Sequence, residues 1–204
     1  MDGAQIMSKG AAYWDKRYAE QGFAYGELPN DFLKSMFSHL TAGQAQGQAI
    51  SLCEGEGRNA VFLAQLGYQV TAVDFSAVGL HKAQILAERH GVEITCQLSD
   101  MADLDLGHQQ WDLVVAIFAQ PESTTRQRLY GQLGQALRAQ GRFVLETKVE
   151  AGADHHDRYP GIDILKQEIA PLETVFAQEA DRVLSEGSYH QGMHRTAQIL
   201  ALRP

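Results

Sequence analysis

The stretch SLCEGEGRNAVFLAQLGYQVTAVD, residues 51–74, decides the fold predicted for this chain. An apolar strand runs into Gly55 and Gly57, and the helical pattern NAVFLAQLG and a second apolar strand ending at Asp74 follow. The letters GEGRNA (55–60) fit the pattern G-x-G-x-x-[G/A], in which glycines allow close approach to the backbone. A plain tight turn between a strand and a helix also has these letters, so the pattern alone leaves both interpretations open.

Strand and helix patterns alternate over about a hundred residues around this stretch. The helical segments end at Gly67, Gly91 and Gly141, and Ser76 is placed to cap the second of them. The predicted strands are 49–53, 68–74, 92–98, 111–118 and 142–148, and the predicted helices are 59–67, 76–91 and 122–141. This alternation is typical of a parallel sheet that helices cover on both faces.

The two ends of the chain depart from this alternation. Residues 13–21 and 32–40 have helical spacing, with a loop rich in Gly and Pro at 22–31 and a polar linker at 41–48. Toward the C-terminus we expect a loop at 153–161, a helix at 162–170, and an antiparallel hairpin of two long strands joined near Glu186–Gly192.

Composition restricts the classes of partner. The formal net charge of −8 argues against non-specific binding of nucleic acid, and the sequence has no basic run or long apolar segment that would favour a membrane role. The start of the chain lacks the apolar region of a secretory signal, so a cytoplasmic protein is the expectation. Cys53 and Cys96 form no disulfide framework, and both are expected to be reduced.

Asp74 indicates what kind of ligand the glycines would approach. A carboxylate at the end of the second strand can accept hydrogen bonds from both hydroxyls of a ribose. A nicotinamide dinucleotide and S-adenosylmethionine are the two candidates. The chain lacks the second nucleotide-binding half of a dinucleotide enzyme, and Glu54 suits an ammonium group better than a pyrophosphate, so S-adenosylmethionine is favoured.

The segments ISLCEGEGRNAVFLAQLGYQVTAVDFS, LSDMADL, WDLVVAIF and LRAQGRFVLETK resemble the ordered motifs of class I S-adenosylmethionine-dependent methyltransferases. Within that family, YWDKRYAEQGFAYGELPNDFL and LSEGSYHQG are similar to the small group of tellurite-resistance and thiopurine-type enzymes. The resemblance implies a Rossmann-like, doubly wound α/β sheet of seven strands, mostly parallel, with a C-terminal antiparallel hairpin. It also implies one domain over 1–204: an N-terminal helical cover (1–47), a cofactor-binding core (48–148) and an acceptor-side part (149–204).

The resemblance also implies a set of cofactor-binding residues. Gly55 and Gly57 would line the methionine portion, Asp74 would hold the ribose, and Asp100 would accept from the adenine amine. The full set is Tyr25, Asn30, Glu54, Gly55, Gly57, Asn59, Asp74, Phe75, Ser76, Asp100, Met101, Ala116 and Phe118. The sequence departs from the family at Ser51 and Cys53, where an acidic residue and a glycine are usual. Glu54 is therefore expected to supply the missing carboxylate.

The implied reaction is methyl transfer to a small-molecule acceptor. A soft sulfur, selenium or tellurium nucleophile is one candidate acceptor; a thiolate or selenide arrives anionic or nearly so and needs no general base, and the sequence offers no clear one. His190 is the best-placed histidine, with a structural role as its alternative. The letters DHHD (154–157) suggest a metal, but neighbouring side chains in a polar loop rarely converge on one ion, so no metal is predicted. A binding module without turnover and an NAD-dependent oxidoreductase remain alternatives, and the acceptor and the oligomeric state are left open.

Overall fold

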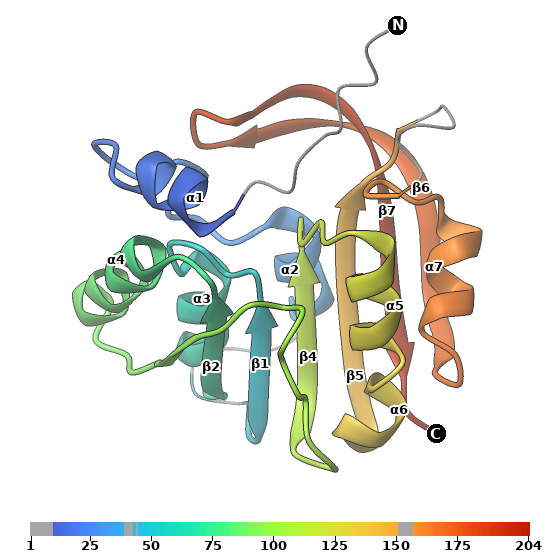
Figure 1. The fold of residues 1–204 in the computed structure, drawn as a ribbon. Helices are drawn as coiled ribbons and strands as arrows, with labels where there is room; N and C mark the ends of the chain where they lie inside the picture. Colours follow the sequence, from blue (N-terminus) through green and yellow to red (C-terminus); the bar gives the residue numbers. More distant parts are fainter. Residues whose placement is uncertain (1–9, 39–42, 44, 151–156) are drawn as a thin grey trace, which may run out of the picture.

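One seven-stranded sheet organises the chain, in the order β3-β2-β1-β4-β5-β7-β6 (Figure 1). The computed structural model describes residues 10–38, 43, 45–150 and 157–204. The strands are β1 (Gln48–Leu52), β2 (Gln69–Asp74), β3 (Thr95–Leu98), β4 (Trp111–Ile117), β5 (Leu137–Lys148), β6 (Glu173–Glu186) and β7 (His190–Leu202). Strands β1 to β5 are parallel, and β7 runs antiparallel to both β5 and β6. The predicted sheet and its C-terminal hairpin are confirmed.

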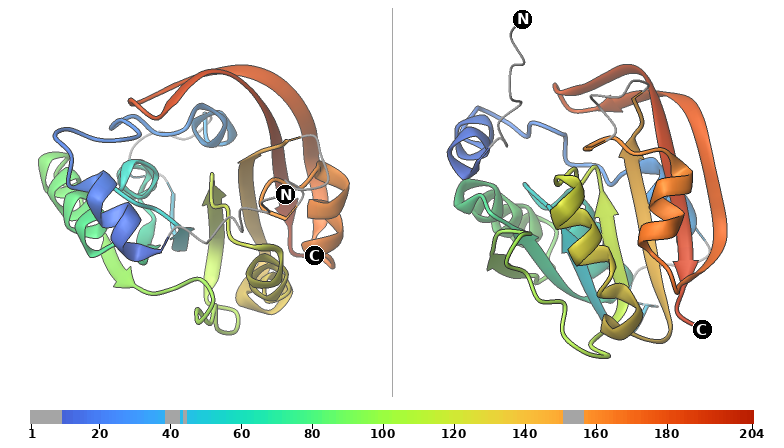
Figure 2. Two further views of the ribbon diagram at one scale, coloured as in Figure 1. Left: turned by 45° about the horizontal axis from the view of Figure 1, so that its top comes forward. Right: turned by 45° about the vertical axis from the view of Figure 1, so that its right-hand side comes forward.

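Helices cover both faces of this sheet (Figure 2). They are α1 (Ala11–Tyr18), α2 (Asp31–Met36), α3 (Arg58–Leu66), α4 (Ala77–Arg89), α5 (Ser123–Tyr130), α6 (Leu133–Ala136) and α7 (Ile162–Glu168). Helices α5, α6 and α7 pack in one apolar core, and α2, α3 and α4 contribute to the core on the opposite face. None of the helices in the described ranges is both long and apolar enough to cross a membrane.

The mostly apolar sequence of β1 reflects this double burial. Ile50 and Leu52 belong to the core beneath α5 and α6, whereas Ala49 points to the core beneath α2 and α3. Successive side chains of a strand face opposite sides, so a strand covered on both faces has no polar alternation. Cys53, which directly follows β1, and Cys96 of β3 are free cysteines, and β2 lies between β1 and β3.

The predicted helix over 122–141 is wrong in its second half. Helix α5 ends at Tyr130, the short α6 follows, and the chain is already extended at Leu137, which pairs with Trp111 of β4. Farther along, Gln140 takes a left-handed backbone conformation (φ 62°), and its N–H donates to the carbonyl of Arg203 at 2.9 Å. Pairing with distant segments therefore overrides the local helix propensity.

Candidate functional site

The predicted site residues gather at the carboxyl ends of the parallel strands. In Figure 1 this edge is at the top, where α1 and the tip of the β6–β7 hairpin lie above the sheet. The chain passes from β3-β2-β1 on one side to β4-β5 on the other, so the topological switch point lies between β1 and β4. Open α/β sheets bind ligands at this point.

Asp74 is the last residue of β2 and lies beside the glycine turn. Its carboxylate accepts from the N–H of Gly55 at 2.9 Å and from the N–H of Ser76 at 2.8 Å. The side chain is buried, and burial raises the pKa of Asp74 to about 6. An ionised carboxylate offers about four acceptor sites, and these two bonds leave the others for hydroxyl donors such as those of a ribose. The residue therefore fits the predicted ribose ligand.

The glycines of the turn approach other parts of the chain. A β-carbon at Gly57 would lie 2.6 Å from Cα of Ala83 in α4, so the absence of a side chain there allows α3 and α4 to pack. A β-carbon at Gly55 would lie 2.6 Å from the hydroxyl of Tyr18, and one at Gly79 would lie 2.8 Å from the same ring. The glycine turn therefore has no side chain at two places: Gly57 allows the contact with α4, and Gly55 allows Tyr18 of α1 to cover the turn.

In addition to the Tyr18 contacts, hydrogen bonds hold helix α1 at the edge of the sheet. Asp15 accepts from the hydroxyl of Ser76 at 2.5 Å and from the N–H of Val78 at 3.3 Å, at the start of α4. Arg17 donates to the Tyr25 hydroxyl at 3.0 Å, and its guanidinium lies 3.9 Å from the ring centre of Tyr189 on the hairpin. Helix α1 therefore links α4 to the hairpin across the site.

Glu54 has the contacts of a helix cap. One oxygen accepts from the N–H groups of Asn59 and Ala60, at 2.9 and 3.0 Å, in the first turn of α3. The other oxygen accepts from the Ser51 hydroxyl. These contacts favour a structural role for Glu54 over the predicted ammonium contact. They also explain the departure at Ser51, because an acidic side chain there would place a second negative charge beside the Glu54 carboxylate.

Asn30 and Asn59 join the N-terminal segment to the core. The Asn30 side chain accepts from the N–H of Leu33, which caps α2, and its amide group donates to Glu146 at 2.6 Å and Glu186 at 2.9 Å. The Asn59 side chain accepts from the Asn30 N–H at 3.0 Å. Both asparagines are buried, and these contacts direct them to the hairpin side of the site.

A buried ionic cluster lies beside Asn30. Glu186 forms ion pairs with Arg58 at 2.7 Å and with Arg182 at 2.9 Å, and Arg182 also lies 3.0 Å from Glu146. Burial by itself would raise the pKa of Glu186, but His190 and the two arginines lower it to about 2. No sequence pattern predicts this cluster, because its members come from α3, β5 and β6, far apart along the chain.

His190 lies between aromatic rings at the end of the hairpin. Its ring centre is 4.5 Å from that of Tyr25 and 4.5 Å from that of Phe118, and both contacts are edge-on. Its Nδ1 atom lies 3.5 Å from an oxygen of Glu186. Tyr25 and Phe118 from the predicted set are thus brought together with the predicted histidine.

The remaining predicted residues lie along the same edge. Met101 and Ala116 are buried in the core beneath α5, while Asp100 is exposed and accepts from the N–H of Ala102 at 2.8 Å. Phe75 is half-buried between Asp74 and the Ser76 cap of α4. Their role toward a cofactor stays a prediction.

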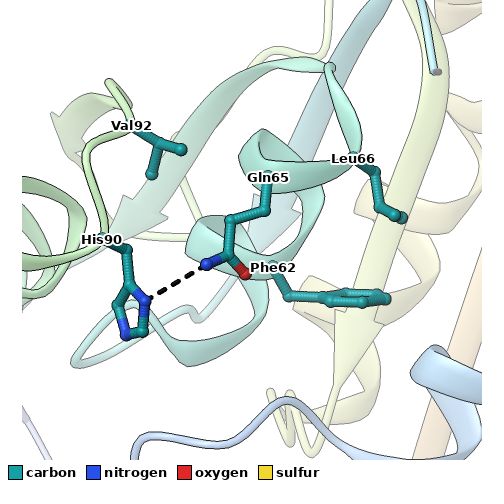
Figure 3. Close-up of a pocket in the computed structure, with 5 residues that line it drawn as sticks. All are labelled: Phe62, Gln65, Leu66, His90 and Val92. Atoms are coloured by element: carbon teal, nitrogen blue, oxygen red, sulfur yellow. Dashed lines mark hydrogen bonds between the residues drawn. The ribbon is translucent and has the colours of Figure 1, made fainter. Parts of the chain in front are cut away.

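One hollow of the surface lies elsewhere. Figure 3 shows its lining by Phe62, Gln65, Leu66, His90 and Val92, with Gln65 3.1 Å from the His90 ring. The ends of α3 and α4 that form it lie at the amino ends of the strands, opposite the predicted site. In the described part of the chain, no group of three His, Cys, Asp or Glu side chains could hold a metal ion, and His155 and His156 fall outside that part.

Comparison with known proteins places a family domain over the core. Residues 49–141 match the family described as a methyltransferase domain. No curated protein sequence matches the chain.

Solved structures share the fold at low sequence identity. TehB from Haemophilus influenzae has a TM-score of 0.70 and 16% identity, with 95% of this chain and 67% of that chain covered. The N-methyltransferase NodS from Bradyrhizobium japonicum WM9, in complex with S-adenosyl-l-homocysteine, has a TM-score of 0.72 and 13% identity over 95% and 98% of the two chains. A structure from work on the conversion of a disulfide bond into a thioacetal group during echinomycin biosynthesis has a TM-score of 0.73 and 16% identity over 95% and 89%.

Proposed function

We propose that the chain is an S-adenosylmethionine-dependent methyltransferase of class I, with its methyltransferase domain at residues 49–141, and that its acceptor is a small molecule with a sulfur nucleophile. The observation that supports the cofactor site is the hydrogen bond between the N–H of Gly55 and the Asp74 carboxylate, which joins the glycine turn after β1 to the end of β2. This pair offers backbone and carboxylate to one ligand at the switch point. The division into cover, core and acceptor side is part of the same proposal.

We assign the cofactor to the surface formed by the β1–α3 turn and the ends of β2 and β3. Asp74 would accept from the ribose hydroxyls, and Asp100, exposed after β3, would accept from the adenine amine. Tyr18 would close the methionine side, because its ring already lies on the glycine turn. When bound, S-adenosylmethionine supplies a methyl group that its sulfonium has already activated.

The acceptor would lie on the β4 and β5 side of the switch point. Phe118, His190 and Tyr25 form an aromatic wall there, which suits a small and partly apolar molecule. The bridge from α1 to the hairpin through Arg17 and Tyr189 would keep bulk water from the reacting atoms. A structural neighbour from work on a disulfide and a thioacetal supports sulfur as the acceptor atom.

Two other functions are alternatives to methyl transfer. A binding module would hold S-adenosylmethionine without turnover, and the altered Ser51 and Cys53 positions are its motivation. An NAD-dependent oxidoreductase would use the same glycine turn, but here β7 returns antiparallel beside β5 instead of a second nucleotide-binding half.

The test uses cofactor with a labelled methyl group and a panel of thiols, selenite and tellurite. Label transferred to a thiol supports the proposal, and label transferred only to other atoms refutes sulfur as the acceptor. Calorimetry with S-adenosylhomocysteine and with NADH completes the test. Tight binding of S-adenosylhomocysteine without transfer to any acceptor would indicate a binding module, and preference for NADH would indicate an oxidoreductase.

A further inference from the structure

We propose that His190 is the general base of the methyl transfer, oriented by Glu186, and that the acceptor is therefore a nucleophile that arrives with its proton, such as an alkyl thiol. This inference rests on the proposed function and specifies the acceptor class of the same site.

The contact between His190 and Glu186 defines the orientation of the imidazole. The two residues face each other at the end of the β6–β7 hairpin, and Nδ1 lies 3.5 Å from the Glu186 carboxylate. Arg58 and Arg182 hold that carboxylate ionised, so it can only accept a hydrogen bond. The proton of a neutral imidazole is thus placed on Nδ1, and Nε2 is left with the basic electron pair.

The imidazole ring of His190 lies on the β4 and β5 side of the switch point, where we place the acceptor. Phe118 directly follows β4, has a left-handed backbone (φ 53°), and is held by a bond of 2.7 Å from its N–H to the carbonyl of Glu146. Its ring meets His190 edge-on, and the ring of Tyr25 meets His190 from another side. Because the glycine turn follows β1, the strand next to β4, an imidazole held against Phe118 lies beside the place where cofactor and acceptor would meet.

The surroundings keep His190 neutral near pH 7. Burial lowers its pKa, and the positive charges of Lys148 and Arg58 lower it further, whereas Glu186 raises it; the net shift is downward. Tyr25 and Phe118 contribute no charge of their own at this pH. A neutral imidazole is the form that can accept a proton.

The S–H bond of the thiol breaks, and its proton goes to Nε2 of His190. The electron pair on the thiol sulfur forms the new bond to the methyl carbon, and the pair of the broken carbon–sulfonium bond stays with the leaving sulfur. The imidazolium afterwards releases its proton to water. An acceptor that is already a thiolate needs no such proton transfer, and this difference makes the role of His190 measurable.

The experiment compares two thiols in the His190→Gln variant. One is an alkyl thiol, protonated at pH 7, and the other is an aromatic thiol with electron-withdrawing groups, ionised at pH 7. We expect kcat for the alkyl thiol to fall by about 10²- to 10⁴-fold and kcat for the ionised thiol by less than about 5-fold. The matched control is His194→Gln, on the same strand, which should leave both rates near wild type. Equal losses for both thiols, or no loss, would overturn the inference.

Two further readouts separate the base from a packing role. In the wild type, kcat for the alkyl thiol should fall as the pH drops through a pKa below the ordinary value of about 6.5, and His190→Gln should abolish this dependence. Nitrogen NMR of His190 in the intact protein should show a neutral ring with its proton on Nδ1 at pH 7. If the wild type methylates no acceptor, the proposed function fails, whereas a charged ring or a proton on Nε2 overturns the inference itself.

Discussion

The hydroxyl of Tyr18 lies so close to Gly55 that a β-carbon at position 55 would come within 2.6 Å of it. Tyr18 is buried at the end of α1, and Gly55 has a left-handed backbone with φ 63°. The close approach that the glycine pattern predicts is therefore made in part by the N-terminal cover of the chain itself. The cover and the glycine turn are coupled in packing, and this coupling can be measured.

Gly55→Ala should destabilise the wild-type protein by about 3 kcal/mol or more, the sum of a left-handed alanine and an overpacked contact with Tyr18. In a Tyr18→Ala background the same substitution should cost only about 1–2 kcal/mol, because only the backbone penalty remains. Urea unfolding of the four proteins of this double-mutant cycle gives both values. The same cost in both backgrounds would show that Tyr18 does not restrict Gly55.

Gly57→Ala should be among the most damaging single changes in the turn. Its β-carbon would meet the backbone of Ala83 at 2.6 Å, so α3 and α4 would have to separate. Gly91→Ala is the matched control, because Gly91 also has a positive φ (67°) but no atom within 4 Å of its β-carbon position. We expect the control to lose about 1–2 kcal/mol and Gly57→Ala to lose clearly more. Equal midpoints in urea would contradict the packing role.

Glu54 should act on stability rather than on cofactor affinity. Glu54→Ala leaves the N–H groups of Asn59 and Ala60 buried without their acceptor, which should cost about 2–4 kcal/mol. Glu54→Gln keeps an oxygen for both and should cost much less. Thermal melting measures these losses, and calorimetry with S-adenosylhomocysteine should give similar affinities for the two variants. If Glu54→Gln lost as much affinity as Glu54→Ala, the result would support the predicted contact between the Glu54 carboxylate and the ammonium group of the cofactor.

Asp74→Ala should weaken S-adenosylhomocysteine binding about 10- to 100-fold, as expected for lost hydrogen bonds to a charged group of roughly 1.5–3 kcal/mol. Asp103→Ala, an exposed carboxylate near the same edge, is the control and should leave affinity unchanged.

The affinity should also depend on pH through Asp74. Hydroxyl donors favour the ionised carboxylate, and burial gives the ligand-free protein a pKa of about 6 at this residue. Affinity should therefore rise as the pH increases through about 6 and level off above it, with proton release on binding below that pH. Calorimetry in buffers of different ionisation enthalpy detects the released proton. An affinity independent of pH would contradict the assignment of the ribose to Asp74.

The sequence predicted the sheet well because each strand and helix of the core has its own periodic pattern. The run from Ile50 to Asp74 predicted two strands and the helix between them within one or two residues. The segment 122–141 failed because its helical pattern competes with pairing between Leu137 and Trp111, which local propensity does not contain. The hydrogen-bond partners of Glu54 likewise depend on how the first turn of α3 is oriented, and its role toward a cofactor stays a prediction.

The sequence by itself determined the fold, the place of Asp74 at the end of β2 and the gathering of the predicted residues at one edge of the sheet. Only the tertiary structure decided which side chains meet there. Glu186 meets Arg58 across 128 positions, and Asn30 meets Glu146 across 116. Periodicity is a property of neighbouring residues, whereas a buried ionic cluster forms when the folded sheet brings distant carboxylates and cations into a region shielded from water, where each charge requires a partner.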